Sequence, residues 1–532
     1  KVLVSCIGKF RYKNIILGVS LSDNDKRTAV YRNYKYFYNR LEAYQNDTET
    51  LSAFIEKGLS KFSVITIELK PDKNPWENPQ EIFESMNSLG KPLSLADLVR
   101  NYLLLGLDAD TQTFLYNHYW LHIENTLSGR ISDYIRDYMQ AHEARPYYKA
   151  TESHYKDLYA LFKKIFTGSD TNELLTDLSD CALLYSYCIG NDQTGSKKID
   201  KELVDLNRMG ITTSYSFLIE LFRAWKDNLL TEQDTADILS AFKIYCMRRR
   251  ILALTQAENK NFPLYVKWIP DLISAADKKQ KMFELLAKQE SNLRLPNDVE
   301  LIRHMETMNF YNFNHCKFFL ALVEENLTKS RPDLSDENLQ IEHIMPRTLS
   351  DKWKAQLGEN YEDIHQGLIN TIGNLTLIRH NQELGNKPFD EKKQKYNENA
   401  GLQIARTGIT DHDVWNETAI KGRTAWITDY ILQNVLPIPD DMRRVNNYTP
   451  KEGKSLSFQN LQLVGLDIEF IDDPSYKAHV VNDKEVEFEG KKWRLSPLTK
   501  EIQTRRGKLS ASGAYSGTQY WAYDGMKLSE FI

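Results

Sequence analysis

The stretch QIEHIMPR at residues 340–347 is followed further along the chain by a second apolar stretch, IGNLTLI at residues 372–378. The apolar and β-branched residues of both stretches predict two short strands. Pro346 ends the first strand, and Gly373 provides the turn that starts the second. The two stretches therefore predict a β-hairpin that carries an acid and a histidine on one strand and Asn374 at the entry to the other.

His343 is the candidate general base, because a neutral imidazole is the side chain poised to accept a proton near pH 7 without special tuning. Glu342 points to the opposite side of the strand locally. Strand twist can still bring its carboxylate to a hard cation, which prefers oxygen ligands.

Further motifs follow the second strand, namely His380-Asn381 and the run Asn386-Lys387-Pro388-Phe389. Together with the hairpin they resemble the HNH nucleases. In wording and spacing, about residues 335 to 400 resemble the C-terminal nuclease domain of GmrSD-type restriction endonucleases. The resemblance implies a fold of two strands and a helix around a metal ion.

The resemblance also implies a role for each motif residue. His343 would be the base, Asn374 the middle residue that holds the loop near the base, and Asn381 the third position. The metal, Mg²⁺ or Mn²⁺, would be held by Glu342 or Asn381. His380 is the alternative to Asn381, because alternation along the chain lets only one of the two face the site.

The chain carries a net charge of −5, so DNA binding must depend on local basic patches. Basic residues around the nuclease motif provide such positive charge for a phosphate backbone. The DNA contacts predicted here are Arg347, Arg379, Lys387 and Lys392.

The run EIFESMNSLGKPLSLADLVRNYL at residues 81–103 predicts a helix, a tight turn and a second helix capped by Ser94. It resembles the N-terminal, ParB/sulfiredoxin-like domain of GmrSD-type proteins, a domain associated with nucleotide binding and hydrolysis. The resemblance implies nucleotide contacts at Asn87, Lys91, Asp97 and Arg100. The Asp-Gly-Gln-Gln-Arg motif of that domain is absent from this sequence, so binding of a nucleoside triphosphate is left open. The alternative interpretation of the run is a helix hairpin with an internal Asp97/Arg100 pair and no ligand.

Residues 105–330 predict helix after helix, with apolar residues at three- and four-residue spacing in 132–139, 155–166 and 234–253. The last of these contains Arg248-Arg249-Arg250, which could meet phosphates or form a solvated or interdomain helix face. Strands are predicted at 2–7, 15–19 and 62–69, and an aromatic-faced helix at 31–43.

Residues 480–495 predict a hairpin with an Asn-Asp turn, Ser496-Pro497 the start of a helix, and residues 520–528 a strand, an Asp-Gly turn and the start of a final helix. This pattern resembles RAMA-type domains, which are found beside restriction enzymes and proposed to read modified DNA. It implies that Trp493, Tyr520 and Trp521 contact DNA or an altered base. The alternative is that such aromatics form the core of a small domain.

No apolar run is long enough to span a membrane, and five scattered cysteines without a Cys-x-x-Cys pair predict a reducing cytoplasm. The predicted fold class is mixed α/β multidomain and predominantly α-helical. The predicted domains are a partial GmrSD-type N-terminal domain at 1–105, a helical region at 106–330, an HNH nuclease domain at 331–436 and a small α+β RAMA-like domain at 456–532.

The resemblances imply a metal-dependent DNA endonuclease of a bacterial anti-phage system, a type IV restriction enzyme whose partner is modified phage DNA. One alternative is a nucleotide-regulated reader of modified DNA with a silent or auxiliary nuclease. Another is a toxin-like nuclease without dependence on modification. Association into a homo-oligomer is left open.

Overall fold

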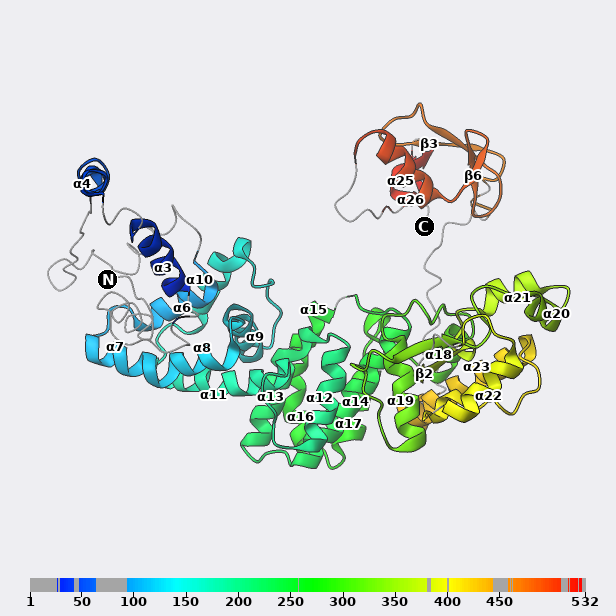
Figure 1. Ribbon diagram of the computed structural model, residues 1–532, viewed down its shortest axis with the longest axis horizontal. Coiled ribbons are helices and arrows are strands. Elements are labelled where there is room, and N and C mark those ends of the chain that lie inside the picture. The colour runs from blue at the N-terminus through cyan, green and yellow to red at the C-terminus, as the bar shows by residue number, and fades with distance from the viewer. Residues whose placement is uncertain are drawn as a thin grey trace. The chain divides into compact units, whose positions relative to one another are not determined.

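The structure is a computed structural model, and it divides the chain into two compact units, residues 1–444 and 445–532 (Figure 1). This division falls between the predicted domain ends at 436 and 456. Within the units, the structure describes residues 26, 29–42, 47–63, 93–256, 258–379, 384–399, 401–443, 458–459, 461, 463–508, 515, 517–524 and 526–528.

The first unit is predominantly helical, as predicted. Its helices up to residue 328 are α3 (Ala29–Glu42), α4 (Thr48–Lys57), α6 (Leu95–Leu104), α7 (Ala109–Leu115), α8 (Leu121–Leu127), α9 (Ile131–Glu143), α10 (Tyr155–Ile165), α11 (Thr171–Ile189), α12 (Lys197–Arg208), α13 (Tyr215–Lys226), α14 (Glu232–Ile251), α15 (Glu258–Asn261), α16 (Ile269–Ser274), α17 (Lys278–Ala287), α18 (Asp298–Met305) and α19 (Cys316–Thr328). The helices predicted at 31–43, 132–139, 155–166 and 234–253 are confirmed as α3, α9, α10 and α14. None of the helices in the described ranges is long and apolar enough to cross a membrane.

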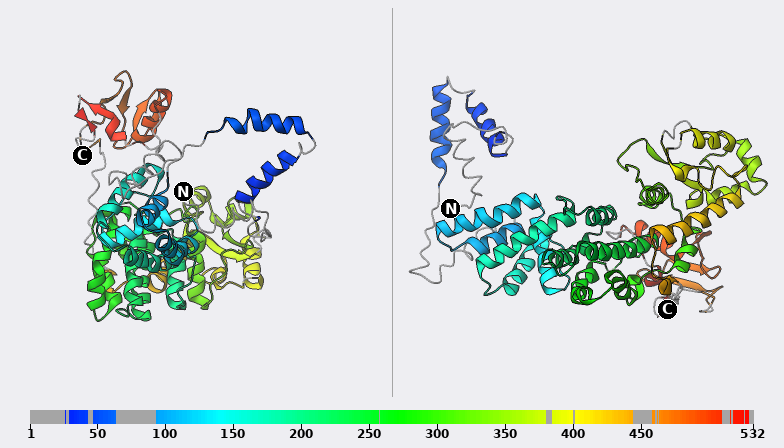
Figure 2. Two further views of the ribbon diagram at one scale, coloured as in Figure 1. Left: turned by 90° about the vertical axis from the view of Figure 1, so that its left-hand side faces the viewer. Right: turned by 90° about the horizontal axis from the view of Figure 1, so that it is seen from below.

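Helices α9 to α17 pack directly against one another, with α11 on α13, α12 on α14 and α14 on α17 (Figure 2). Their contact faces are rich in leucine, phenylalanine and tyrosine, and these side chains merge into one large core. Burial of such apolar area, rather than helix propensity, supplies most of the stability of packed helices.

The predicted strands at 2–7 and 15–19 lie outside the described residues, as does residue 64 onward of the strand at 62–69. Asn87 and Lys91 also lie outside them. Asp97 is described, and its carboxylate caps the start of α6 in a reciprocal pair with Ser94. It also bonds Arg100 at 3.0 Å, so these two residues form the internal pair considered above.

The arginine run in α14 is neither a phosphate-binding surface nor a solvated face. Arg248 and Arg249 are fully buried. Arg248 donates to the carbonyl oxygens of Leu436 and Pro296 and pairs with Asp298 at 2.7 Å. Burial lowers the pKa of Arg248 to about 10. The hydrogen bonds to the two carbonyls and the ion pair with Asp298 offset the cost of removing its charge from water.

The predicted hairpin is present as β1 (Leu339–His343) and β2 (Leu375–Arg379), which pair antiparallel with Ile341 opposite Leu377. Two short helices, α20 (Asp351–Leu357) and α21 (Tyr361–Leu368), lie in the connection. Helix α22 (Phe389–Asn399) follows, then α23 (Glu417–Tyr430) and α24 (Asp440–Arg443). Helix α19 packs on β2, and α23 packs on the one-turn helix η7 (Ile372–Asn374) that leads into β2.

The second unit is a six-stranded antiparallel sheet in the order β6-β5-β4-β3-β7-β8. The strands are β3 (Asp467–Phe470), β4 (Lys477–Val480), β5 (Val486–Phe488), β6 (Lys491–Trp493), β7 (Trp521–Tyr523) and β8 (Met526–Lys527). Helices α25 (Leu495–Arg505) and α26 (Gly517–Tyr520) complete it. The core of this unit is separate from that of the first.

Three local predictions for this unit need correction. Residues 480–495 contain two turns rather than one, because Glu489-Gly490 adopts positive φ and separates β5 from β6. Helix α25 begins at Leu495, and the hydroxyl of Ser496 accepts from the Gly517 amide instead of capping the helix. The segment after Asp524 continues as the short strand β8, not as a helix, because it pairs with β7.

We expect replacement of Arg248 by alanine to lower the free energy of unfolding by about 3–5 kcal/mol, because two buried carbonyls and Asp298 lose their partner. The thermal midpoint of unfolding should fall accordingly. Circular dichroism melting of the full chain measures this. The matched control is Lys267→Ala, an exposed residue, which should leave the midpoint unchanged. An unchanged midpoint in Arg248→Ala would contradict the role assigned to the buried guanidinium.

Candidate active site

His343 is the last residue of β1, and its imidazole is held by a side chain that the motif does not include. Its Nε2 lies 3.1 Å from Oδ1 of Asn370. An amide oxygen only accepts hydrogen bonds, so Nε2 carries the proton and Nδ1 is left as the proton-accepting nitrogen. The backbone carbonyl of Asn370 accepts from the amides of Phe310 and Tyr311, which fixes the loop before α19 against the same residue.

Three further side chains surround this imidazole. The Tyr311 ring lies with its centroid 4.5 Å from that of His343, and the exposed Arg347 guanidinium lies 5.8 Å from the Tyr311 ring centroid. The His365 Nε2 is 2.9 Å from the carbonyl oxygen of Pro346. The hairpin end is therefore a compact group of two histidines, a tyrosine, an amide and one solvent-facing cation.

Burial is the main cause that lowers the pKa of His343 below its usual 6.5, and the positive charges of Arg347 and Lys392 lower it further. The hydrogen bond to Asn370 acts in the opposite direction and raises the pKa. Since the lowering effects prevail, His343 is neutral at pH 7. A neutral, oriented imidazole is the protonation state that a general base requires.

Asn374 holds the loop that follows His343. Its side chain is fully buried. The amide oxygen accepts from the Met345 amide at 2.7 Å and from the Trp415 indole at 3.1 Å. The amide nitrogen donates to the carbonyl oxygens of Met345 and Ile369. The backbone contact near the base that the motif predicts for this residue is therefore present, and all four hydrogen-bonding positions of the carboxamide are occupied.

The turn before β2 is held from behind by α23. A Cβ on Gly373 would lie 2.2 Å from Oγ1 of Thr424 and 2.3 Å from the Ile420 carbonyl oxygen, so only glycine fits. Arg423 is buried beside it and donates to the carbonyl oxygens of Gly373 and Leu375 at 2.8 and 2.7 Å. Burial lowers the pKa of Arg423 to about 9.

Glu342 and Lys392, predicted as metal ligand and DNA contact, form a buried ion pair with each other. Lys392 Nζ lies 2.6 Å from Oε1 of Glu342 and 2.8 Å from the carbonyl oxygen of His343, and neither side chain is exposed beyond 6%. Burial lowers the pKa of Lys392. The structure places Lys392 where no phosphate reaches it, so its assignment as a DNA contact is corrected to an internal tie between α22 and β1.

The local geometry explains this outcome. Neighbouring residues of a strand point to opposite faces, so His343 and Glu342 face away from each other. Helix α22 covers the Glu342 face, where the Tyr396 hydroxyl also lies 3.4 Å from the carboxylate. The expectation that strand twist brings this carboxylate to the His343 face is therefore not met.

The remaining predicted residues are distributed as follows. Asn381 and His380 lie outside the described residues. Arg379 pairs with Asp336 at 3.2 Å, at the end of the hairpin remote from His343. Lys387 is half-buried and its carbonyl accepts from the Trp353 indole. Of the four predicted basic contacts, only Arg347 therefore lies beside His343 and faces solvent.

In the second unit, Trp521 is a core residue. It is fully buried, and its indole donates to Oγ1 of Thr499 at 3.0 Å, so its assignment as a DNA contact is corrected. Trp493 and Tyr520 are half-buried. The Trp493 ring has the Lys491 ammonium 4.6 Å from its centroid, so this ring and its cation form one partly exposed aromatic surface of the unit.

Within the described part of the chain, no three His, Cys, Asp or Glu side chains are grouped closely enough to hold a metal ion. The described donors therefore do not by themselves make a metal site. His380 and Asn381 follow directly after the described end of β2 and are the donors that the motif adds.

Sequence reasoning missed Asn370, Tyr311 and His365. Asn370 stands four positions before Asn374, so its place in the loop that returns to β2 was a usable signal. Tyr311 and His365 come from the loop before α19 and from α21, and nothing in their local sequence distinguishes them from core or surface residues.

We expect Lys392→Met to lower the free energy of unfolding by about 3–5 kcal/mol, because the buried Glu342 carboxylate loses its cation. The thermal midpoint of unfolding should fall accordingly. The double variant Glu342→Gln with Lys392→Met should recover part of this loss. Melting curves of the three proteins test the pair. Lys395→Met, on the same helix but more exposed, is the control. A Lys392→Met protein with native stability and weakened DNA affinity would instead support the DNA contact.

A search among curated proteins finds no match to this chain. Residues 295–430 match the family model described as the C-terminal domain of GmrSD restriction endonucleases. The matched span includes the loop with Tyr311, the whole hairpin and α23, and so every described residue of the candidate site. Residues 295–430 are therefore a GmrSD-type C-terminal domain.

Proposed function

We propose that this chain is a DNA endonuclease that hydrolyses phosphodiester bonds at the hairpin end around His343. The match of residues 295–430 to a domain of restriction endonucleases supports a nuclease that acts on DNA. The observation that carries the assignment to this site is the neutral, buried imidazole of His343, oriented through Nε2 by Asn370 with Arg347 beside it.

In the proposed reaction, Nδ1 of His343 accepts a proton from water as the water oxygen bonds to phosphorus. The bond from phosphorus to the leaving oxygen of the sugar breaks, and that oxygen takes up a proton from solvent. Asn370 keeps the imidazole in the required tautomer, and the Arg347 guanidinium contacts the negatively charged phosphate.

A divalent ion, Mg²⁺ or Mn²⁺, is part of the proposal, and when bound it would stabilise negative charge on the phosphate. Glu342 is not proposed as a ligand of this ion, because its carboxylate is paired with Lys392. The protein ligands would be Asn381 or His380. Magnesium commonly keeps several waters and needs only one or two protein ligands, so such a sparse donor set is compatible with it.

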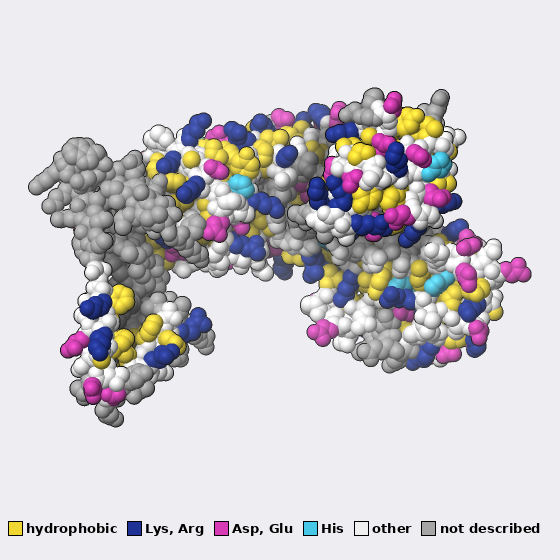
Figure 3. All heavy atoms as spheres, turned by 90° about the horizontal axis from the view of Figure 1, so that it is seen from above, with side chains coloured by type: hydrophobic (Ala, Val, Ile, Leu, Met, Phe, Trp, Pro, Cys, Tyr) yellow, Lys and Arg dark blue, Asp and Glu magenta, His cyan; other side chains and the backbone are white. Residues whose placement is uncertain are grey.

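The proposed target is modified phage DNA in the cytoplasm, with the second unit as the reader. The face drawn in Figure 3 mixes Lys and Arg with Asp and Glu among the described residues, so specific contacts rather than overall charge would select DNA on this face. Trp493 with Lys491 and Tyr520 would provide stacking and a phosphate contact there. A reader with a silent nuclease and an unspecific toxin-like nuclease are the other outcomes of the experiments below.

We expect His343→Ala to lose about 10²–10⁴-fold in cleavage rate, the usual contribution of a general base. Wild type and variant are incubated with unmodified, hydroxymethylated, glucosylated and phosphorothioated DNA, with Mg²⁺, Mn²⁺ or chelator. His118→Ala, an exposed histidine in the helical region, is the control and should cut like wild type. Absence of cutting on every substrate would leave the reader, and equal cutting of all substrates would favour the unspecific nuclease.

The pH dependence of cleavage provides a second test. His343 must be neutral to accept a proton, and its pKa is held below 6.5. The midpoint of the decline in activity on the acid side should therefore lie below pH 6.5. Arg347→Ala removes a cation that lowers this pKa, so the declining limb should move to higher pH; Asn370→Ala should move it lower. A wild-type limb centred above pH 6.5 would exclude His343 as the base.

A further inference from the structure

A pocket of about 350 Å³ lies in the first unit, among helices of the helical region and the end of the nuclease-side helix α23. Its walls come from α12, α14, α17, α19 and the π-helical turn η10 (Ile431–Val435), segments far apart in the sequence. The volume falls within the roughly 300–1,000 Å³ of small-molecule sites. It admits a molecule of mononucleotide size and excludes a double helix.

The pocket is lined by basic side chains from four of these segments. The lining cations are Lys201, Lys243, Lys279, Lys329 and Arg331, against a single lining carboxylate, Glu325. Two more carboxylates, Glu202 and Asp205, pair with Lys243 from behind. Counted together, these groups leave two positive charges in excess, so the pocket attracts an anion.

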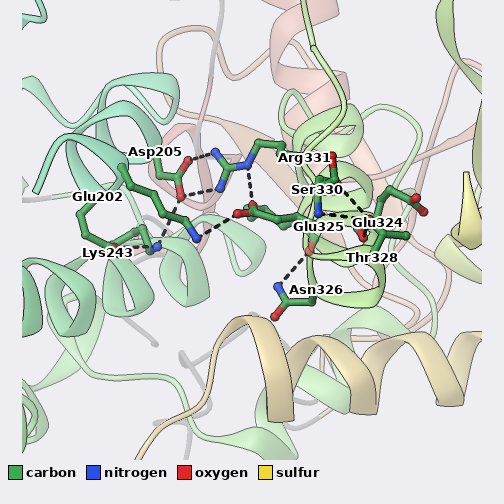
Figure 4. Close-up of polar contacts among 11 residues, drawn as sticks. Glu202, Asp205, Lys243, Glu324, Glu325, Asn326, Thr328, Ser330 and Arg331 are labelled. Atoms are coloured by element: carbon green, nitrogen blue, oxygen red, sulfur yellow. Dashed lines mark hydrogen bonds and ion pairs between the residues drawn. The ribbon is translucent and has the colours of Figure 1, made fainter. Parts of the chain in front are cut away.

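Ion pairs fix three of the five cations in place (Figure 4). Arg331 bonds the fully buried Asp205 and also Glu325, at 2.6 Å to the latter. Lys243 bonds Glu202 at 2.6 Å, and Lys201 bonds Glu325 at 2.9 Å. The wall is therefore preorganised, and a ligand would not have to order it on binding.

Lys279 and Lys329 differ from these three. Among the described residues, neither ammonium group has an ion-pair or hydrogen-bond partner. Lys279 is half-buried in the second position of α17, and Lys329 ends α19 with positive φ. Two such ammonium groups, from the start of α17 and the end of α19, that line one basic pocket are suited to a phosphate group.

The other lining residues indicate what the phosphate is attached to. The apolar part consists of Ile244, Met247, Leu322, Val435 and Pro437. Amide and hydroxyl groups of Asn326, Asn434 and Ser240 lie beside it. A lining that combines apolar side chains, a few amide and hydroxyl groups and several cations is the lining expected of a site for a base and sugar joined to phosphate.

We propose that this pocket binds a nucleoside phosphate. The site is separate from the hairpin end around His343, and the inference does not depend on the nuclease assignment. It also differs from the predicted nucleotide contacts at residues 87–100, since none of those residues lines it.

The pocket is connected to the candidate active site through α19. Glu324, next to the lining residue Glu325, accepts from the backbone amides of Gln403 and Ile404 at 3.0 and 2.7 Å. The Ile404 carbonyl in turn accepts from the Thr376 hydroxyl in β2. A ligand that shifts α19 therefore acts on the strand that pairs with His343.

Titration calorimetry on the full chain tests the proposal with ADP, GDP, CDP and UDP as probes, and with pyrophosphate, adenosine and a short DNA duplex as comparisons. We expect at least one nucleoside diphosphate to bind more tightly than pyrophosphate or adenosine. The double variant Lys279→Glu with Lys329→Glu should weaken it at least tenfold. Its thermal midpoint should be unchanged, since neither lysine has a partner.

The matched control is Lys288→Glu, which changes an exposed lysine at the end of the same helix α17 and should leave binding unaffected. Nucleotide binding that survives the double variant would place the ligand elsewhere and overturn the proposal. Binding of pyrophosphate or duplex with no gain from the nucleoside would overturn it as well, and so would the absence of any binding at millimolar concentration.

Discussion

The carboxamide of Asn374 is the interaction on which the candidate site depends. It occupies both the amide and the carbonyl of Met345, one carbonyl of the loop that returns to β2, and the indole of Trp415. The direction of the chain after His343 is thereby fixed by a group that never meets solvent. Because an amide both donates and accepts, neither a carboxylate nor an apolar side chain of the same size could make this set of bonds.

Buried cations that donate to backbone carbonyls are a second feature that stabilises the first unit. Arg248, Lys392 and Arg423 are each withdrawn from water, and each donates to backbone carbonyls at a junction between segments distant in the sequence. A guanidinium or ammonium can satisfy several carbonyls at once where helices and loops end. At these positions the cation serves the fold, and Lys392 shows that a basic residue beside the hairpin motif can belong to the core.

The sequence allowed correct prediction of what is local. The two strands and the turn at Gly373 follow from spacing and residue type, and the loop-holding role of Asn374 was implied by the family resemblance. It could not predict which face α22 covers, and that contact turned Glu342 and Lys392 from site residues into an ion pair. Asn370 and Tyr311 reach His343 only through tertiary folding. Trp521 shows the same limit, because the sequence of a strand with aromatic residues does not show which of its two faces is buried.

The close approach at Gly373 has a consequence for how the domain can be divided. The start of β2 rests directly on Ile420 and Thr424 of α23, with no room for a methyl group between them, although these segments are separated by α22 and a long loop. A fragment cut after α22 would contain the complete hairpin motif and still lack the surface against which it closes. A fragment that keeps the hairpin together with this contact must therefore extend through α23.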